Sequence, residues 1–296
     1  MDGLLIIDKP AGPTSHDVVA RMRRVLGERR IGHTGTLDPG ASGVLPLVIG
    51  RATRLAKFLS GGRKTYEAIV RFGVATDTYD ADGTQVGARS TEPPPSHDAI
   101  ERALDDFRGT FTQQPPAYSA KKIDGERSYK AARADRPTLP DPVSVTVHRL
   151  EFVRLDGDEA TLRVDCSAGF YVRSLAHDLG IRLGVGAHLS ALRRTVSAGL
   201  TLDEAMPLEF AERSRDDATA AILPLEAMLP HMNAVVLTDE GVMRVLHGRN
   251  VGAAEAVSGV IEAAGPTKLL DQAGQLVAIA EETDTPGVLH PSVVLR

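Results

Sequence analysis

Residues 32–46 read GHTGTLDPGASGVLP and place a single carboxylate in a loop rich in glycine and proline, directly before an apolar segment. Glycine allows backbone conformations with positive φ and a close approach to a ligand. Pro39 disfavours helical dihedral angles at Asp38, so we expect this carboxylate to project from an extended turn. The run 44–49 predicts a buried strand that anchors the loop.

The carboxylate of Asp38 has two interpretations. An acid on a rigid loop suits a nucleophile or a general base. The same composition also fits a solvated Gly/Pro turn in which the acid only caps the backbone. The loop by itself leaves both interpretations open.

Apolar residues on both sides of the loop recur with the periods of strands and helices. The run 4–7 predicts a strand, and the alternation over 66–72 predicts another. Thr14 or Ser15 can cap a helix that ends at Gly27. Further segments with strand or helix periodicity are 52–59, 96–107, 143–147, 160–166 and 172–183. Because strands and helices do not alternate strictly, we expect an α+β fold.

Length and composition indicate an ordinary globular protein. The chain has 296 residues, which allows one large domain and a small one, and 42% of them are hydrophobic. Its one cysteine, Cys166, allows no intrachain disulfide and fits a reducing compartment. We find neither a secretory signal nor an apolar run long enough to span a membrane, so we expect a cytoplasmic protein.

The charge is distributed unevenly along the chain. The formal net charge is −5, which by itself argues against a nucleic-acid-binding protein. Residues 1–73, however, carry twelve basic and six acidic side chains, a net charge of +6 that leaves −11 for the rest. Clustered arginines and lysines near the loop can contact phosphates, whereas single arginines usually belong to a solvated helix face. Taken as a whole, the asymmetry favours contacts with phosphates over a solvated helix face.

The stretch 32–46 resembles the catalytic loop of the TruB family of bacterial tRNA pseudouridine synthases, which convert uridine 55 of the T-loop to pseudouridine. The resemblance implies the pseudouridine synthase fold, a mixed and mainly antiparallel sheet with a central cleft, in residues 1–229. It also implies an insertion at about 73–136 that grips the T-loop arm. Short apolar runs after a hinge at 224–230 resemble the family's small β-rich PUA domain, which we expect in residues 230–296.

The resemblance implies three residues that act directly in the reaction. Uridine isomerisation breaks the N1–C1′ bond, rotates the base and rejoins it through C5, and Asp38 is the expected catalytic carboxylate. Residues 166–173, CSAGFYVR, resemble the family pattern C-S-x-G-x-Y-[IV]-R, whose arginine, here Arg173, pairs with the aspartate. Tyr66 matches the tyrosine that stacks on the target base. The sequence leaves open whether the carboxylate attacks C1′, adds to C6 or abstracts a sugar proton.

Five further residues are expected to bind the substrate. Leu192 matches the floor of the uracil pocket, and His33 matches a residue that fills the space left by flipped bases. Asp80, in the acidic loop 76–83, is expected near the active-site network. Tyr171, next to Arg173 in its motif, and Arg54, one of the N-terminal basic residues, complete the set. Taken singly, these residues fit core, turn or surface positions equally well.

Two positions of the CSAGFYVR segment depart from the family, which often has lysine and threonine where this chain has Ala168 and Phe170. An RNA contact from those positions is therefore not expected. Lys9 matches a family motif that packs beside the catalytic loop, so the resemblance implies that it supports the loop rather than reacts.

The sequence contains no motif typical of cofactor binding or of the other common reaction classes. No P-loop, G-x-S-x-G motif or spaced His/Cys cluster occurs, so we expect neither a metal nor a nucleotide cofactor. We expect tRNA as the partner and a monomeric protein. Two alternatives remain: an RNA-binding protein without catalysis, which would yield no product, and an acid-dependent hydrolase built on Asp38, which would not require structured RNA.

Overall fold

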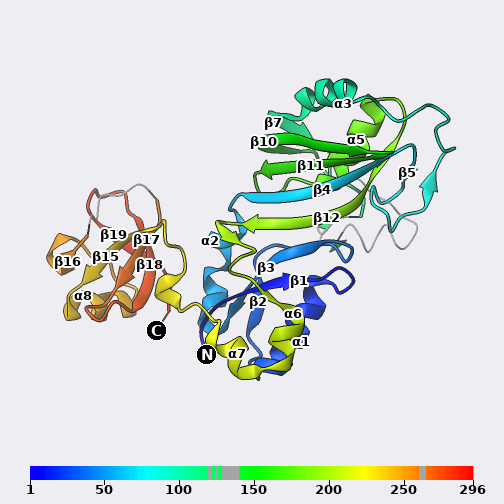
Figure 1. Cartoon of the computed structure of the whole chain (residues 1–296). Helices are drawn as coiled ribbons and strands as arrows, with labels where there is room; N and C mark the ends of the chain where they lie inside the picture. Colours follow the sequence, from blue (N-terminus) through cyan, green and yellow to red (C-terminus); the bar gives the residue numbers. More distant parts are fainter. Residues whose placement is uncertain (119–121, 124–125, 128–139, 260–264, 296) are drawn as a thin grey trace.

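The computed structural model describes residues 1–118, 122–123, 126–127, 140–259 and 265–295. Figure 1 shows a large body built around one curved sheet and a smaller β-rich body that carries the C-terminus. Part of the expected insertion at 73–136 lies outside the described residues, namely 119–121, 124–125 and 128–136. The described part of the insertion contains α3 (His97–Leu104) and long stretches without helix or strand.

The large sheet is mixed and mainly antiparallel, which confirms the expected fold class. Its strands lie in the order β14-β1-β3-β12-β4-β11-β10-β7, with β2 paired to β3 and β13 to β12. The β1–β14 and β3–β12 pairs are parallel, and the other pairs described are antiparallel. The strands are β1 (Gly3–Lys9), β2 (Ile31–His33), β3 (Ser42–Ile49), β4 (Lys64–Phe72), β7 (Gly109–Gln113), β10 (Val143–Asp156), β11 (Glu159–Cys166), β12 (Ala187–Ser197), β13 (Leu200–Thr201) and β14 (Met206–Pro207).

The helices of the large body other than α2 cover one face of this sheet, as the continuous core cluster shows, whereas α2 packs on the opposite face. Alternate residues of β1 and β3 point to opposite faces, and Leu5 and Ile7 join the cluster under α1 and α5. In Figure 1, α3 and α5 lie over one half of the sheet, and α1, α6 and α7 lie at the β1 end. The helices are α1 (Ser15–Leu26), α2 (Ala56–Ser60), α5 (Val172–Arg182), α6 (Leu208–Arg213) and α7 (Arg215–Ala220), with 3₁₀ turns at Gly50–Leu55, Asp105–Phe107 and Leu225–Ala227.

Helix α1 begins and ends where its sequence predicts. The Thr14 side chain accepts a hydrogen bond from the Asp17 amide at 3.0 Å, and the Asp17 carboxylate accepts one from the Thr14 amide at 2.9 Å. These two bonds form a capping box, which satisfies amides that the first helical turn leaves unpaired. At the other end Gly27 has φ 68°, a left-handed conformation that glycine adopts without a steric cost.

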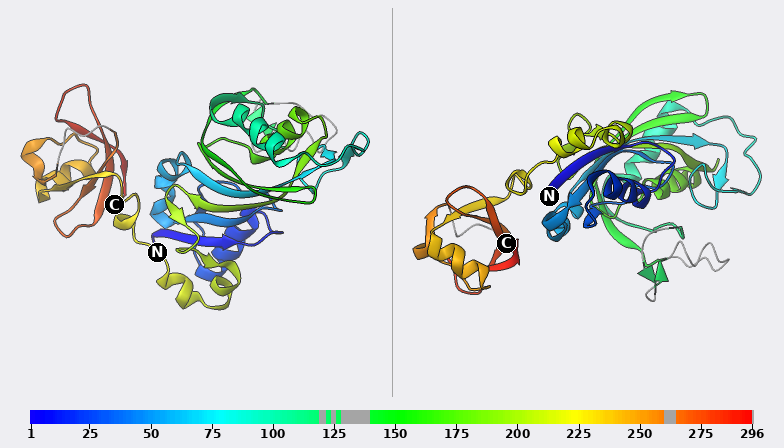
Figure 2. Two further views of the ribbon diagram at one scale, coloured as in Figure 1. Left: turned by 45° about the horizontal axis from the view of Figure 1, so that its top comes forward. Right: turned by 90° about the horizontal axis from the view of Figure 1, so that it is seen from below.

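The smaller body is a five-stranded sheet in the order β16-β15-β17-β18-β19. Its strands are β15 (Asn233–Leu237), β16 (Ala256–Ser258), β17 (Thr267–Leu270), β18 (Leu276–Glu282) and β19 (Leu289–Val294), and its helix is α8 (Asp239–Leu246), after which a 3₁₀ turn spans Ala253–Glu255. Figure 2 shows that this body projects from one end of the large one. A second apolar cluster joins the two bodies, with Leu4 and Val48 on one side and Ile279 and Val293 on the other.

The remaining described strands form two short hairpins in the insertion. They are β5 (Ala75–Thr76) with β6 (Gln85–Val86), and β8 (Lys122–Ile123) with β9 (Glu126–Arg127). The acidic loop 76–83 begins in β5 and forms most of its connection to β6, and it lies against β12 through a bridge between Asp80 and Leu189. The loop therefore reaches the same region of the sheet as the glycine-rich segment 32–46.

Candidate active site

The loop that connects β2 and β3 is held in place by two buried polar side chains from β1 and α1. The Lys9 Nζ donates hydrogen bonds to the carbonyls of Ala41 at 2.6 Å and Pro39 at 3.2 Å. The Ser15 hydroxyl accepts a hydrogen bond from the Leu37 amide at 2.9 Å and donates one to its carbonyl at 3.0 Å. Since these contacts flank Asp38 on both sides, the backbone that carries the carboxylate is fixed.

Gly43 ends the loop at a position that only glycine can occupy. Its φ is +104°, and a Cβ built on it would lie 2.1 Å from the carbonyl oxygen of Arg194. Glycine removes this clash and lets β3 approach β12, to which Gly43 pairs. The residue therefore joins the end of the loop to the strand that carries Leu192.

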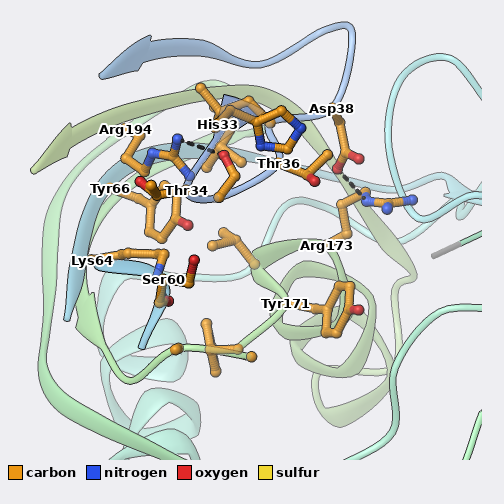
Figure 3. Close-up of a pocket in the computed structure, with 17 residues that line it drawn as sticks. His33, Thr34, Thr36, Asp38, Ser60, Lys64, Tyr66, Tyr171, Arg173 and Arg194 are labelled. Atoms are coloured by element: carbon orange, nitrogen blue, oxygen red, sulfur yellow. Dashed lines mark hydrogen bonds and ion pairs between the residues drawn. The ribbon is translucent and has the colours of Figure 1, made fainter. Parts of the chain in front are cut away.

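Asp38 and Arg173 meet between the loop and the start of α5. The Nε of Arg173 lies 3.0 Å from Oδ2 of Asp38, and their side chains face each other in Figure 3. The arginine side chain is 7% exposed and the aspartate side chain 43% exposed. The pair therefore combines a buried cation with a carboxylate that a substrate can reach.

Arg173 is fixed by three more acceptors besides Asp38. Its Nη1 donates to the Thr78 carbonyl at 3.0 Å and lies 3.5 Å from Oδ2 of Asp80. Its Nη2 donates to the Tyr118 carbonyl at 2.8 Å. A guanidinium has five donors in a rigid planar arrangement, so these contacts determine its orientation.

The start of α5 is positioned by β7. The Gln113 side chain accepts a hydrogen bond from the Tyr171 amide at 2.8 Å and donates one to the Tyr171 carbonyl at 3.0 Å. This side chain is 2% exposed. It binds both backbone groups of Tyr171, the N-cap residue of α5, and thereby fixes the backbone two residues before Arg173.

A cavity of about 440 Å³ opens beside the ion pair. It is lined by six of the expected site residues, namely Asp38, Arg173, Tyr66, His33, Leu192 and Tyr171, and also by Lys64, Ser60 and Arg194. A smaller hollow of about 70 Å³ adjoins it and is lined by Asp80, Asp38, Arg173 and Leu192. The large cavity is in the size range of small-molecule sites.

Tyr66 lies at the back of the cavity, beside a buried cation. Burial raises the pKa of Tyr66 to about 12, an effect that the neighbouring Arg194 guanidinium opposes. The phenol is therefore protonated at neutral pH and offers a flat aromatic face rather than a base. In Figure 3 its ring points into the space between the loop and α5.

Arg194 and Lys64 support this wall of the cavity. Fully buried Arg194 donates to the carbonyls of Val44 at 2.7 Å and Gly35 at 3.0 Å. Lys64 donates to the carbonyls of Ser60 and Gly62, and burial lowers its pKa. Burial also lowers the pKa of Lys9, to about 8. Arg194 and Lys9 thereby hold the loop between β2 and β3, and Lys64 holds the turn between α2 and β4.

The structure brings seven of the eight expected site residues together. Six line the large cavity and Asp80 lines the adjoining hollow. Arg54 lies elsewhere: its guanidinium donates to the carbonyl of Val294 in the smaller body. Sequence alone did not reveal this, because an arginine in a short predicted helix has the same appearance at an interdomain contact and at an RNA-binding surface.

Sequence reasoning missed Arg194, Lys64 and Ser60 as lining residues. A signal existed for Arg194, because alternation along a strand puts it on the same face as Leu192. The two positions that depart from the family also line the cavity. Phe170 packs edge-to-face on Phe111 with ring centroids 6.4 Å apart, and Ala168 lies beside it, which makes this wall apolar.

The described residues contain neither a cluster of metal ligands nor a membrane-spanning helix. Over the residues that the structure describes, no group of three or more His, Cys, Asp and Glu side chains is placed to hold a metal ion. Within the same ranges, no helix combines the length and apolar character needed to cross a bilayer.

Comparisons with known proteins cover the whole chain. Residues 23–172 match the family described as "TruB family pseudouridylate synthase (N terminal domain)", and residues 173–230 match "tRNA pseudouridylate synthase B C-terminal domain". The chain is 44% identical over 297 residues to a tRNA pseudouridine synthase B of Solibacter usitatus, covering 100% of both chains. It is 38% identical to the protein of that name from Pseudomonas aeruginosa, over 100% of this chain and 96% of the other.

Two solved structures have the same fold. A chain in "Crystal Structure of a Cbf5-Nop10-Gar1 Complex" superposes with a TM-score of 0.75 at 28% identity, covering 99% of this chain and 85% of the other. A chain in "Structure of H/ACA RNP bound to a substrate RNA containing 2'-deoxyuridine" gives a TM-score of 0.73 at 26% identity, with 99% and 85% coverage. Both likenesses include the large sheet and the smaller β-rich body.

Proposed function

Because the chain belongs to the TruB family of pseudouridylate synthases, we propose that it converts uridine 55 in the T-loop of tRNA to pseudouridine, with Asp38 as the catalytic carboxylate. The observation that carries this proposal is the reachable carboxylate of Asp38, oriented by buried Arg173 at the edge of a cavity. Relatives that align with the full chain are named tRNA pseudouridine synthases, which supports tRNA as the substrate.

The reaction requires the base to leave its stack, because a stacked base can neither enter the cavity nor turn after its glycosidic bond breaks. In this proposal the flipped uracil enters the cavity, stacks on Tyr66 and rests on Leu192. Tyr171 and His33 complete the walls of the cavity. An aromatic ring suits a step in which the base rotates, since stacking does not fix the orientation of the base in its plane.

Asp38 then acts on the nucleotide as an ionised group. The N1–C1′ bond breaks, the uracil turns, and a C5–C1′ bond forms; C5 loses its proton and N1 gains one, so the reaction is an isomerisation. Arg173 holds the carboxylate toward the cavity through the 3.0 Å contact, and Asp80 helps to hold Arg173. A preorganised ion pair of this kind needs no rearrangement during the reaction.

We also propose that the chain consists of two domains with different roles. Residues 1–229 form the catalytic domain, including a T-arm-gripping insertion at about 73–136, and residues 230–296 form a PUA-like RNA-binding domain. The five-stranded C-terminal sheet supports the second assignment. We propose in addition that the protein is a monomer that needs no cofactor and, because its substrate is tRNA, that it is cytoplasmic.

The test is tritium release from C5-labelled uridine in an unmodified T-arm stem-loop. We expect release from the wild-type protein and one pseudouridine, mapped to position 55. The matched control is the same stem-loop with cytidine at position 55, from which no tritium should be released. Tight binding without release would contradict the proposal and favour an RNA-binding protein without catalysis.

A further inference from the structure

The acidic loop 76–83 is tied to α5 at a second point besides Arg173. The rings of Tyr79 and His177 are stacked, with centroids 3.7 Å apart and an interplanar angle of 11°. His177 follows Arg173 by four residues in α5, so both side chains leave the same face of the helix. The loop thus contacts one face of α5 twice, once through the guanidinium and once through the stacked rings.

Tyr79 lies between the two loop residues that orient Arg173. The preceding residue, Thr78, offers its carbonyl to Arg173 Nη1 at 3.0 Å, and the following residue, Asp80, places its Oδ2 3.5 Å from the same atom. The Tyr79 carbonyl also accepts a hydrogen bond from the Leu189 amide at 2.9 Å. A displacement of Tyr79 would therefore move both acceptors that turn Arg173 toward Asp38.

The backbone of Tyr79 has an unfavourable conformation. Its φ is +66°, in the left-handed region that non-glycine residues adopt infrequently and aromatic residues especially so. Such conformations persist where surrounding contacts determine them, and they occur at functional sites. The ring stack on α5, the bond from the Leu189 amide and the bond of the Tyr79 amide to the Thr76 carbonyl at 3.3 Å hold Tyr79 in this conformation.

His177 contributes a flat ring rather than a polar contact. Its Nδ1 is buried, and within the described part of the chain it has no hydrogen-bond partner. Burial lowers the pKa of His177, so the imidazole is neutral at pH 7 and stacks as an uncharged ring. A phenylalanine at this position would keep the stacking surface and lose no hydrogen bond.

We propose that Tyr79 and His177 are a positioning pair, whose stacked rings hold the loop 76–83 on α5 and thereby orient Arg173 toward Asp38. Neither residue lines the cavity, so both act through Arg173 rather than on the nucleotide. This inference rests on the proposed function for its kinetic test, and a second test does not depend on activity.

The kinetic test compares single-turnover rate constants and Kd values on the T-arm stem-loop. We expect His177→Ala and Tyr79→Asn to lower the rate constant about tenfold, since small displacements of a catalytic group cost one to two orders of magnitude. Asparagine tolerates the left-handed conformation and only removes the ring. The matched variant His177→Phe should keep the rate within about twofold, and Kd should not change in any variant.

A double-mutant cycle with Asp80→Asn separates positioning from a general loss of stability. If His177 acts through Asp80 and Arg173, His177→Ala should have little further effect on the rate in the Asp80→Asn background. Independent effects that multiply, or equal losses for His177→Ala and His177→Phe, would overturn the proposal.

Crystal structures of the wild-type protein and His177→Ala without RNA provide the test that is independent of turnover. The proposal predicts that Arg173 and Asp38 stay in contact in the wild type and separate in the variant. An unchanged Arg173–Asp38 contact in the variant would overturn the positioning pair. A wild type that retains this contact but makes no pseudouridine would instead contradict the proposed function, while separation in the variant would still support the pair.

Discussion

The Nε of Arg173 lies 3.0 Å from Oδ2 of Asp38, and the two side chains differ sharply in exposure, 7% against 43%. The arginine is enclosed by the Thr78 and Tyr118 carbonyls, so it cannot follow the carboxylate into solvent. The carboxylate therefore stays at the edge of the cavity, where a nucleotide can reach it.

Replacing Arg173 by lysine should lower the rate of pseudouridine formation about 10²-fold to 10³-fold, the usual effect of losing a preorganised charged donor. Lysine keeps the charge but lacks the planar donors that contact Asp38, Thr78 and Tyr118 together. Single-turnover kinetics would measure the effect. Full activity of Arg173→Lys would show that the charge suffices and that the orientation is unimportant.

Replacing Ser15 by alanine should lower both stability and activity. The variant leaves the amide and carbonyl of Leu37 without their buried partner, which should lower the free energy of unfolding by about 1–3 kcal/mol. Because Leu37 precedes Asp38, the rate should fall as well. Urea denaturation and single-turnover kinetics would measure the two effects.

The matched control for Ser15→Ala is the neighbouring substitution Thr14→Ala. It removes the cap of α1 and should lower the free energy of unfolding by about 1 kcal/mol, but it leaves the bonds to Leu37 intact. Its rate should stay within about twofold of the wild type. Equal loss of rate in both variants would mean that α1 stability, not the loop anchor, limits the reaction.

Tyr66 should act through its ring more than through its hydroxyl. Tyr66→Leu removes the stacking surface and should lower kcat/KM about tenfold to a hundredfold, because stacking on a base contributes about 1–3 kcal/mol. Tyr66→Phe keeps the ring and should lose less. Since the pKa of Tyr66 is about 12, the pH–rate profile below pH 10 should not change shape in Tyr66→Phe. A larger loss in Tyr66→Phe than in Tyr66→Leu would contradict this role.

Removing the charge of Asp178 should raise the free energy of unfolding in a pH-dependent way. Burial raises the pKa of Asp178 to about 6, so the folded protein binds more protons than the unfolded chain between about pH 4 and 6. Stability contributed by this group therefore falls as the pH rises through that window. Asp178→Asn should be more stable than the wild type at pH 7, by about 1 kcal/mol after screening is considered, with no difference below pH 4.

Urea denaturation at several pH values would measure this effect. The control is Asp156→Asn, which neutralises an exposed carboxyl at the end of β10 and should show no comparable gain. A gain in Asp178→Asn that persists below pH 4 would mean that altered packing, and not the buried charge, is responsible.

Local sequence patterns predicted most of the large body. Thr14 and Gly27 delimit α1 because caps are local, and strand 66–72 was predicted because alternate residues enter the core. The proximity of Asp38 and Arg173 came from the family resemblance, since no local rule relates residues on separate elements. Arg54 was expected to bind the substrate, and its contact with the smaller body could not be predicted from a local pattern.

Contacts that depend on tertiary packing could not be predicted from the sequence. Arg194 is fully buried because Val44 and Gly35 supply carbonyls from two other segments. The stack of Tyr79 on His177 likewise joins a loop to a helix that follows much later in the chain. In both cases the partner is defined only after the sheet has formed.

The most direct test of the account compares tritium release by Asp38→Asn with that by the wild type on the unmodified T-arm stem-loop. Glu67→Gln makes the same chemical change at an exposed position beside Tyr66 and serves as the control. We predict release from the wild type and Glu67→Gln, none from Asp38→Asn, and similar Kd values for all three, because phosphate contacts supply the binding. Tritium release by Asp38→Asn at the wild-type rate would contradict the assignment of Asp38 as the catalytic carboxylate.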